Sequence, residues 1–351
     1  MSVVSRLDGF QRRHPVVSYP LAVVYKFFED QGPYLAALVA YYGLLSLVPL
    51  LLLLSTILGY VLAGNPGAQQ AVLDSAVTQI PVLGQEVGDP GSLGGGGAGL
   101  AIGIAGALYG SLGVGLAVQN ATNIAWGVPR NERPNPFKAR LRSLLLMVTA
   151  GLFVVGTTVL NVVLADVFVD DGVLRWASRL GYTVLAAVGF TMAFWLAVAH
   201  RPPITTVLPG ALTMAVLWQF LQRFGQGLVN LVSERASVSN QVFTAVLGLI
   251  AFLFITSCVV VLCVEADVVR VRRLYPRALL TPFTDAVELT EGDQRAYTRI
   301  AQAQRHKGFE RVHVEFGESP LERHRGPAAP SEPGGEGGAD RDLERVVEDD
   351  R

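Results

Sequence analysis

Polar side chains inside long apolar runs are the residues of this sequence that could do chemistry. In the first run, Tyr42, Ser46 and Pro49 follow one another at spacings of four and three residues, so they share one helix face. Proline has no N–H, so the carbonyl of Leu45 loses its usual partner, and in lipid only another helix or water can replace it. The motif indicates either a kink packed against other helices or a face that lines a cavity or a moving gate.

The second run begins in glycines and ends in amides. Asn120 and Asn123 lie one turn apart, next to Gln119 and just before Trp126, which belongs at the interfacial aromatic belt. These amides either line a polar pathway or cap and join helices. Glycines four residues apart let helices approach closely, and we expect such packing at Gly99, Gly103, Gly106 and Gly110.

The third run carries a polar face with one cation. Its members fall at i, i+3, i+4 and i+7 of one helix and are Gln219, Gln222, Arg223 and Gln226. Burying the charge of an arginine inside a membrane costs free energy, so such a residue is by default a candidate functional residue. Arg223 can also extend to the outer interface as an anchor. The pattern leaves both interpretations open, the wall of a polar cavity and a simple anchor.

The sequence lacks the residue patterns that metal binding, nucleotide hydrolysis and nuclease activity need. The five histidines are scattered, no spacing resembles a zinc site, and the chain has no Walker A motif for ATP hydrolysis. A metal-dependent nuclease needs clustered acids or histidines beside a basic groove, whereas the basic residues here lie next to apolar runs. We therefore expect no enzyme activity, no metal, no cofactor and no nucleic-acid partner.

The elements that must position these residues are membrane helices. The chain has 351 residues, 51% hydrophobic and 16% charged, against roughly 25% charged in soluble domains. Apolar stretches of about 18 residues or more are typical of transmembrane helices. We predict an all-α polytopic membrane protein with six spans in one bundle, at about residues 34–63, 98–121, 141–168, 181–199, 206–230 and 241–266.

The distribution of lysine and arginine predicts that both termini are cytoplasmic. Cytoplasmic loops collect these residues near the helix ends. They gather before the first span and after spans two, four and six, whereas the predicted outer loop 64–97 contains none. All six spans fit this alternation.

The chain divides into three parts. Residues 1–33 form a cytoplasmic segment with a candidate interfacial helix, residues 34–275 the membrane domain, and residues 276–351 a polar cytoplasmic tail. The outer loop contains a predicted short amphipathic helix at about residues 68–80. In the tail we expect a surface helix around "DQRAYTRIAQAQRH" and, from about residue 317, a disordered end rich in proline, glycine and acid.

Four stretches of the chain resemble the YihY/BrkB family of bacterial inner-membrane proteins, once labelled ribonuclease BN. They are "LAALVAYYGLLSLVPLLLLL", "NATNIAWGVPRNERPNPFKARL", "PGALTMAVLWQF" and "VVVLCVEADVV", and the resemblance covers about residues 20–275. The entry to span six departs from the family, with "SVSNQVFTAVLGLIAF" in place of a Tyr-Gly-rich turn and a tryptophan-bearing run. The resemblance implies a six-helix inner-membrane protein, with proposed family roles in export of amphipathic molecules or lipids and in resistance to host killing.

We therefore expect a transporter or exporter of an amphipathic small molecule or lipid, acting through a cavity lined by spans one, two and five. The alternative is a non-transporting scaffold that organises the envelope. Membrane lipids are the expected partners in both cases. A polar cavity at bilayer depth favours transport, and a solid bundle favours a scaffold.

Overall fold

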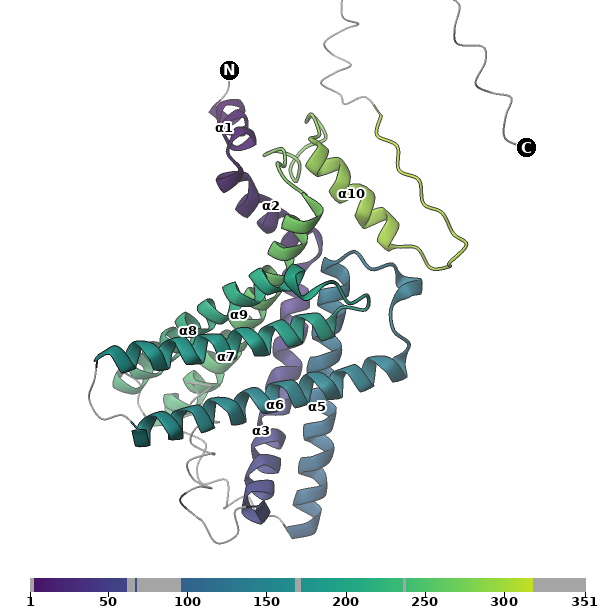
Figure 1. The fold of residues 1–351 in the computed structure, drawn as a ribbon. Coiled ribbons are helices and arrows are strands. Elements are labelled where there is room, and N and C mark those ends of the chain that lie inside the picture. Colours follow the sequence, from purple (N-terminus) through teal and green to yellow (C-terminus); the bar gives the residue numbers. More distant parts are fainter. Residues whose placement is uncertain (1–2, 62–66, 68–95, 168–171, 236–237, 318–351) are drawn as a thin grey trace, which may run out of the picture.

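The described part of the chain is helical. The computed structural model describes residues 3–61, 67, 96–167, 172–235 and 238–317 (Figure 1), and these residues contain no strand, which confirms the all-α prediction for this part. The helices are α1 (Val3–Arg13), α2 (Pro15–Glu29), α3 (Gly32–Val61), α5 (Gly96–Ala125), α6 (Pro136–Val167), α7 (Gly172–Ala197), α8 (Ile204–Arg235), α9 (Val238–Arg272) and α10 (Glu291–Ala303), with a 3-10 turn at Arg130–Glu132.

Each predicted span overlaps one long helix, α3 or one of α5 to α9. Within the described residues, four segments are long and apolar enough to cross a membrane: Pro136–Thr157, Leu180–Ala197, Ile204–Gly225 and Val246–Arg272. A shorter apolar stretch of α3 covers Gly32–Leu47. Long helices suit this setting because they satisfy their own backbone hydrogen bonds in lipid. The chain is therefore a multi-pass membrane protein, and the number of six spans stays a prediction.

The long helices form two groups. Figure 1 shows α3 and α5 running side by side down the view, while α6, α7, α8 and α9 cross them. The groups touch where α9 packs on α3 and α6 packs on α5. The main apolar core runs along α9 from Leu249 to Val269, and at one end of the helices it brings together Ala22, Trp126, Phe194, Met214 and Val268 from α2, the end of α5, α7, α8 and α9.

Glycines form the seam between α3 and α5. A Cβ atom added to Gly110 would lie 2.6 Å from Cα of Ser46, and one added to Gly113 would lie 2.1 Å from the Tyr42 ring. Such contacts require glycine, as the small-residue spacing predicts for Gly110. Gly106 of the same helix is half-buried. The surroundings of Gly99 and Gly103 lie outside the described side chains.

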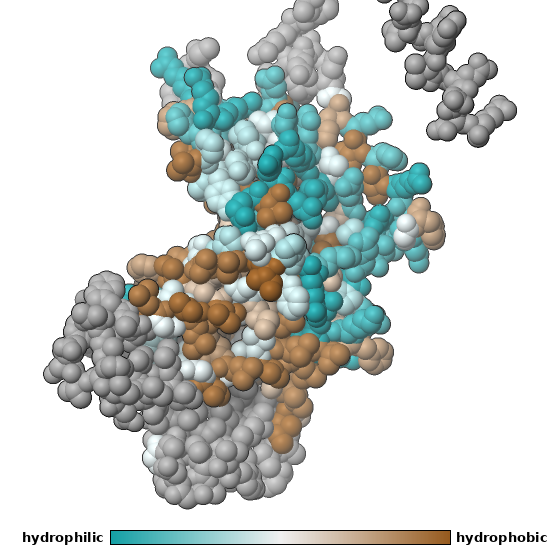
Figure 2. Space-filling model, viewed as in Figure 1, coloured by the Kyte–Doolittle hydropathy of each residue, from teal (hydrophilic) through white to brown (hydrophobic). Residues whose placement is uncertain are grey.

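Several chain segments meet at the polar end of the molecule. Figure 2 shows mostly hydrophilic surface over α10 and the end of the molecule near α1, and hydrophobic surface over α6 to α9. The expected tail helix is present as α10, and its Asp293 is fully buried. The segment 276–303 therefore packs against the other helices at this end. The predicted helix 68–80 and the tail after residue 317 lie outside the described residues.

Candidate functional site at the polar end of the helices

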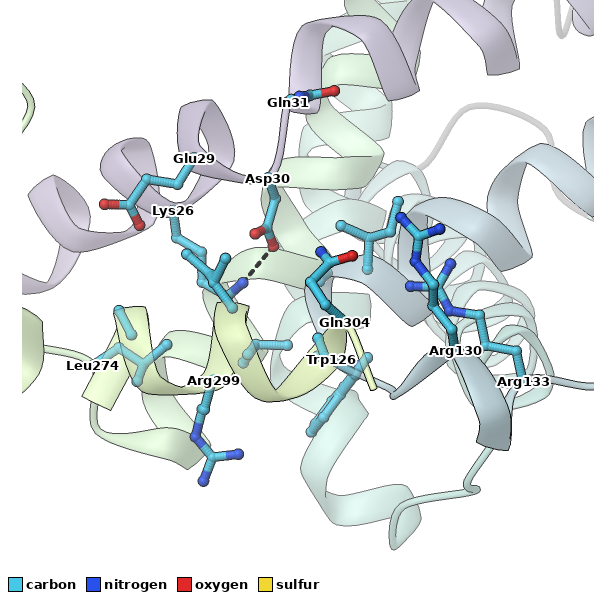
Figure 3. A pocket seen from close by; sticks show the side chains of 17 residues that line it. Lys26, Glu29, Asp30, Gln31, Trp126, Arg130, Arg133, Leu274, Arg299 and Gln304 are labelled. Carbon is cyan, nitrogen blue, oxygen red and sulfur yellow. Dashed lines mark hydrogen bonds and ion pairs between the residues drawn. The ribbon is translucent and has the colours of Figure 1, made fainter. Parts of the chain in front are cut away.

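A pocket of about 240 Å³ lies where α2, α5, α9 and α10 meet. Figure 3 shows Arg130 and Arg133 together at one wall, Arg299 at the opposite wall, and Trp126 between them. The pocket has polar and apolar walls. Its lining is Lys26, Glu29, Asp30, Gln31, Ile124, Ala125, Trp126, Gly127, Arg130, Arg133, Val268, Leu274, Ala296, Arg299, Ile300, Ala303 and Gln304.

The end of α5 places the two arginines at the first wall. Gly127 follows the helix with φ +62°, a left-handed conformation that glycine adopts without strain. The Val128 N–H then donates to the Asn123 carbonyl at 2.9 Å and closes the helix end. The guanidinium of Arg133 turns back to donate to Asn120 Oδ1 at 3.3 Å. This wall is therefore fixed by the backbone hydrogen bond that closes α5 and by the Asn120 side chain.

A buried lysine of the pocket lining, Lys26, joins α2 to α9. Lys26 Nζ lies 2.5 Å from Asp30 Oδ2 and 3.2 Å from Glu265 Oε2, and all three side chains are at most one tenth exposed. Burial by itself would lower the pKa of Lys26, but the Glu265 and Asp30 carboxylates outweigh it, and the pKa is raised above 10.5. Lys26 therefore stays charged and holds α2 against α9.

A buried arginine attaches α10 over the pocket. Arg277 has no exposed surface, and it pairs with Glu29 at the end of α2, with Nη1 3.1 Å from Oε2. Its Nε lies 2.5 Å from Asp293 Oδ1. Asp293 also closes the capping box that begins α10 at Thr290. The Asp293 carboxylate therefore has two roles: it completes the capping box of α10 and it pairs with Arg277.

The three arginines that line the pocket have no carboxylate partner among the described residues. Arg130 lies near Arg133, and Arg299 lies near Arg272, which is outside the lining and also has no carboxylate partner among the described residues. Burial and the charge of Arg130 lower the pKa of Arg133, and burial and the charge of Arg272 lower the pKa of Arg299. The guanidinium carbon of Arg272 lies 5.9 Å from the centroid of a Trp126 ring, in a cation–π contact. Each pair holds two positive charges close together.

The residues of the first motif face α5. Ser46 is buried and half-buried Tyr42 packs on Gly113. The Ser46 hydroxyl donates to the Gly43 carbonyl at 2.8 Å. The side chain of Pro49 lies outside the described side chains.

The amides of the second motif join helices. Asn123 is buried, and its Oδ1 accepts from the Ala199 N–H at 2.8 Å, just after α7. Gln119 Nε2 donates to Ser143 Oγ of α6 at 2.9 Å. Asn120 holds Arg133, as described above. Asn120 therefore belongs to the pocket's supporting structure, while Asn123 holds the end of α7.

The residues of the third motif lie on α8, which packs against α7 and α9. Arg223 is exposed, and Gln219 and Gln222 are half-buried. The side chain of Gln226 lies outside the described side chains. Among the described residues, no group of three or more His, Cys, Asp or Glu side chains could hold a metal ion.

Sequence reasoning did not identify the two buried ion clusters around Lys26 and Arg277. Arg277 follows α9 within a basic stretch, where its charge was assigned to topology. The cation of Glu265 is Lys26, whereas Asp267 pairs with Arg270 at 3.3 Å. A signal was available, because a carboxylate within an apolar helix requires a cation.

The comparison with protein families gives one match. The family described as virulence factor BrkB matches residues 23–284. This range includes the arginine pair after α5, both buried ion clusters except Asp293, and the motif of Tyr42 and Ser46. No curated protein and no solved structure matches the chain.

Proposed function

We propose, from the premise that this chain belongs to the virulence factor BrkB family, that it moves an amphipathic small molecule or a lipid across the bacterial inner membrane. The observation that supports this most is the mixed lining of the pocket. One part is apolar, with Ile124, Val268 and Leu274, and another is cationic, with Arg130 and Arg133. A molecule with a charged and an apolar part fits both surfaces.

The pocket's volume indicates which part of such a molecule it holds. Pockets for whole drug-sized ligands measure about 300–1,000 Å³, and this one measures about 240 Å³. It therefore suits a head group or a compact polar end. The apolar remainder would extend toward the lipid-facing helices.

The proposed topology has six spans and both termini in the cytoplasm. Contacts between alternate helix ends support it. Asn123 at the end of α5 bonds Ala199 after α7, and the Gly210 N–H near the start of α8 donates to Asp267 near the end of α9 at 3.0 Å. With both termini in the cytoplasm, the pocket would lie on the cytoplasmic side of the membrane.

In the proposed mechanism, the pocket captures the substrate from the inner leaflet and the α3–α5 pair moves to admit it. Pro49 would serve as the hinge, because it removes one backbone hydrogen bond of α3. The chain has no nucleotide motif, so movement would follow a gradient. We further propose that the protein is not an enzyme.

A second candidate function is a scaffold that organises the envelope without transport. The observation that favours it is the close packing of the helices. The cavity between α3, α5 and α9 measures about 10 Å³, and a single water needs about 10–15 Å³. A passage through these helices would therefore require them to separate.

Reconstitution into vesicles distinguishes the two functions. Purified protein is placed in vesicles that carry a fluorescent phospholipid, and an impermeant reductant reports how fast inner-leaflet label reaches the outer leaflet. A transporter accelerates this exchange over protein-free vesicles, in proportion to the amount of protein. A scaffold leaves the rate at that of protein-free vesicles. Equal rates with and without the protein would overturn the proposal that it moves lipid.

A further inference from the structure

We propose that the pocket binds a phosphate group between Arg130 and Arg133, and that this phosphate belongs to the head group of an anionic lipid. The inference rests on the proposed function, because it names the substrate class of the same pocket. Arginine suits this ligand, since its planar guanidinium offers paired donors to two phosphate oxygens.

The charges around the pocket leave these arginines available. Asp30 pairs with Lys26 at 2.5 Å and Glu29 pairs with Arg277. The carboxylates that line the pocket therefore already have cations. Arg130 and Arg133 have no carboxylate partner among the described residues.

The two arginines differ in how firmly they are held. Arg133 is half-buried and donates to Asn120 Oδ1 and to the Val128 carbonyl, both at 3.3 Å. Arg130 is exposed, and no hydrogen bond or ion pair of its side chain is found in the described structure. Arg133 thus forms a fixed part of the wall, and Arg130 is free to close on a ligand. An anion between them would also relieve their mutual repulsion.

The surroundings favour a lipid as the source of the phosphate. Trp126 lines the pocket immediately after α5, and tryptophan concentrates at the depth of lipid head groups. Ile124 and Leu274 add an apolar wall that inorganic phosphate would not use.

A binding measurement tests the inference without any transport. The full chain, purified in a maltoside detergent that contains no phosphate, is titrated by calorimetry with dihexanoyl phosphatidylglycerol and separately with inorganic phosphate. Arg130→Gln removes one donor group and leaves every described contact in place. Its matched control is Arg311→Gln, which removes the same charge from an exposed residue outside the pocket.

The inference predicts that the wild type and Arg311→Gln bind the lipid equally and that Arg130→Gln binds it about tenfold more weakly, as expected for one lost charge-assisted bond. Inorganic phosphate should bind much more weakly than the lipid. Equal affinity of all three proteins for the lipid would overturn the phosphate site. Phosphate binding as tight as the lipid, and equally sensitive to Arg130→Gln, would keep the phosphate site and overturn the lipid source.

The outcome is separable from the proposed function. Arginine-dependent lipid binding in a protein that moves no lipid in vesicles would retain this site and remove transport. Transport that is unchanged by Arg130→Gln, together with unchanged binding, would retain transport and remove this site. A second variant, Arg133→Gln, is titrated with the same lipid. Its unfolding temperature is measured as well, because Arg133 also supports the end of α5.

Discussion

Ser46 of α3 lies directly against Gly110 of α5. A Cβ atom added to Gly110 would lie 2.6 Å from Ser46 Cα and 2.8 Å from Ser46 N, so the two helix backbones are in contact. This contact explains why a serine of the proline motif is buried. The serine hydroxyl donates a hydrogen bond to the Gly43 carbonyl within its own helix.

Gly110→Ala should destabilise the protein by about 1–3 kcal/mol, the usual cost of overpacking. The new methyl group meets backbone atoms of Ser46, which cannot move aside as a flexible side chain can. The unfolding temperature in detergent measures the change. Gly151→Ala on α6 is the control, since nothing lies within 4 Å of its added Cβ, and alanine should leave stability equal or slightly higher. Equal behaviour of the two variants would contradict the described seam.

Lys26→Met should cost about 3–5 kcal/mol, because it leaves buried Glu265 and Asp30 without their cation. Adding Glu265→Gln to that variant should recover part of the loss by removing one stranded charge. Glu291→Gln is the contrast, since its pair with Arg295 is exposed and should contribute below about 1 kcal/mol. Chemical unfolding in detergent measures all three. If the double variant has a lower free energy of unfolding than Lys26→Met, the unpaired buried carboxylates are not the cause of the loss.

Asp293→Asn should loosen α10 from the rest of the protein. Thr290 remains the N-cap of α10, and the side-chain oxygen of asparagine can still accept from the Ala278 and Thr290 N–H groups, so the change mainly removes the carboxylate charge that pairs with Arg277. We expect a loss of about 1.5–3 kcal/mol of local stability, seen as faster amide hydrogen exchange over residues 291–303. Asp285→Asn, at an exposed position of the preceding loop, should leave exchange in α10 unchanged. If both variants exchange like the wild type, Asp293 does not hold α10.

Cysteine labelling tests the proposed topology. In a background without Cys258 and Cys263, Ser92→Cys should react with an impermeant thiol reagent applied to the outer face of the membrane, and Asn135→Cys should react only after the membrane is opened. The expectation follows from the absence of lysine and arginine in residues 64–97 and their abundance after α5. The reverse pattern would rule out both the orientation and the cytoplasmic pocket.

Local sequence patterns predicted the helices and part of their packing. Apolar runs placed α3 and α5 to α9, and the glycine spacing predicted the close approach at Gly110. The stretch around "DQRAYTRIAQAQRH" predicted α10. These features depend on neighbours in the chain, such as a glycine repeat or a continuous hydrophobic segment.

The pocket could not be predicted in the same way. Glu29 and Arg277 are 248 residues apart, and nothing in either neighbourhood specifies the other. Arg130 and Arg133 resemble ordinary charges beside a membrane helix, so topology accounted for them fully. Their surplus over the available carboxylates becomes visible only when the folded chain assigns Lys26 and Arg277 to the acids of the pocket.

Blocking the pocket is the most direct test of the claim that substrate passes through it. Gln304, which directly follows α10, lines the pocket and is exposed, whereas Gln294 within α10 is exposed and does not line it. Gln304→Cys and Gln294→Cys are prepared without the native cysteines, labelled with a bulky maleimide in detergent, and placed in vesicles that report lipid exchange. Labelled Gln304→Cys should fall to the rate of protein-free vesicles, while labelled Gln294→Cys keeps the rate of its unlabelled form. Full exchange by labelled Gln304→Cys would contradict the claim.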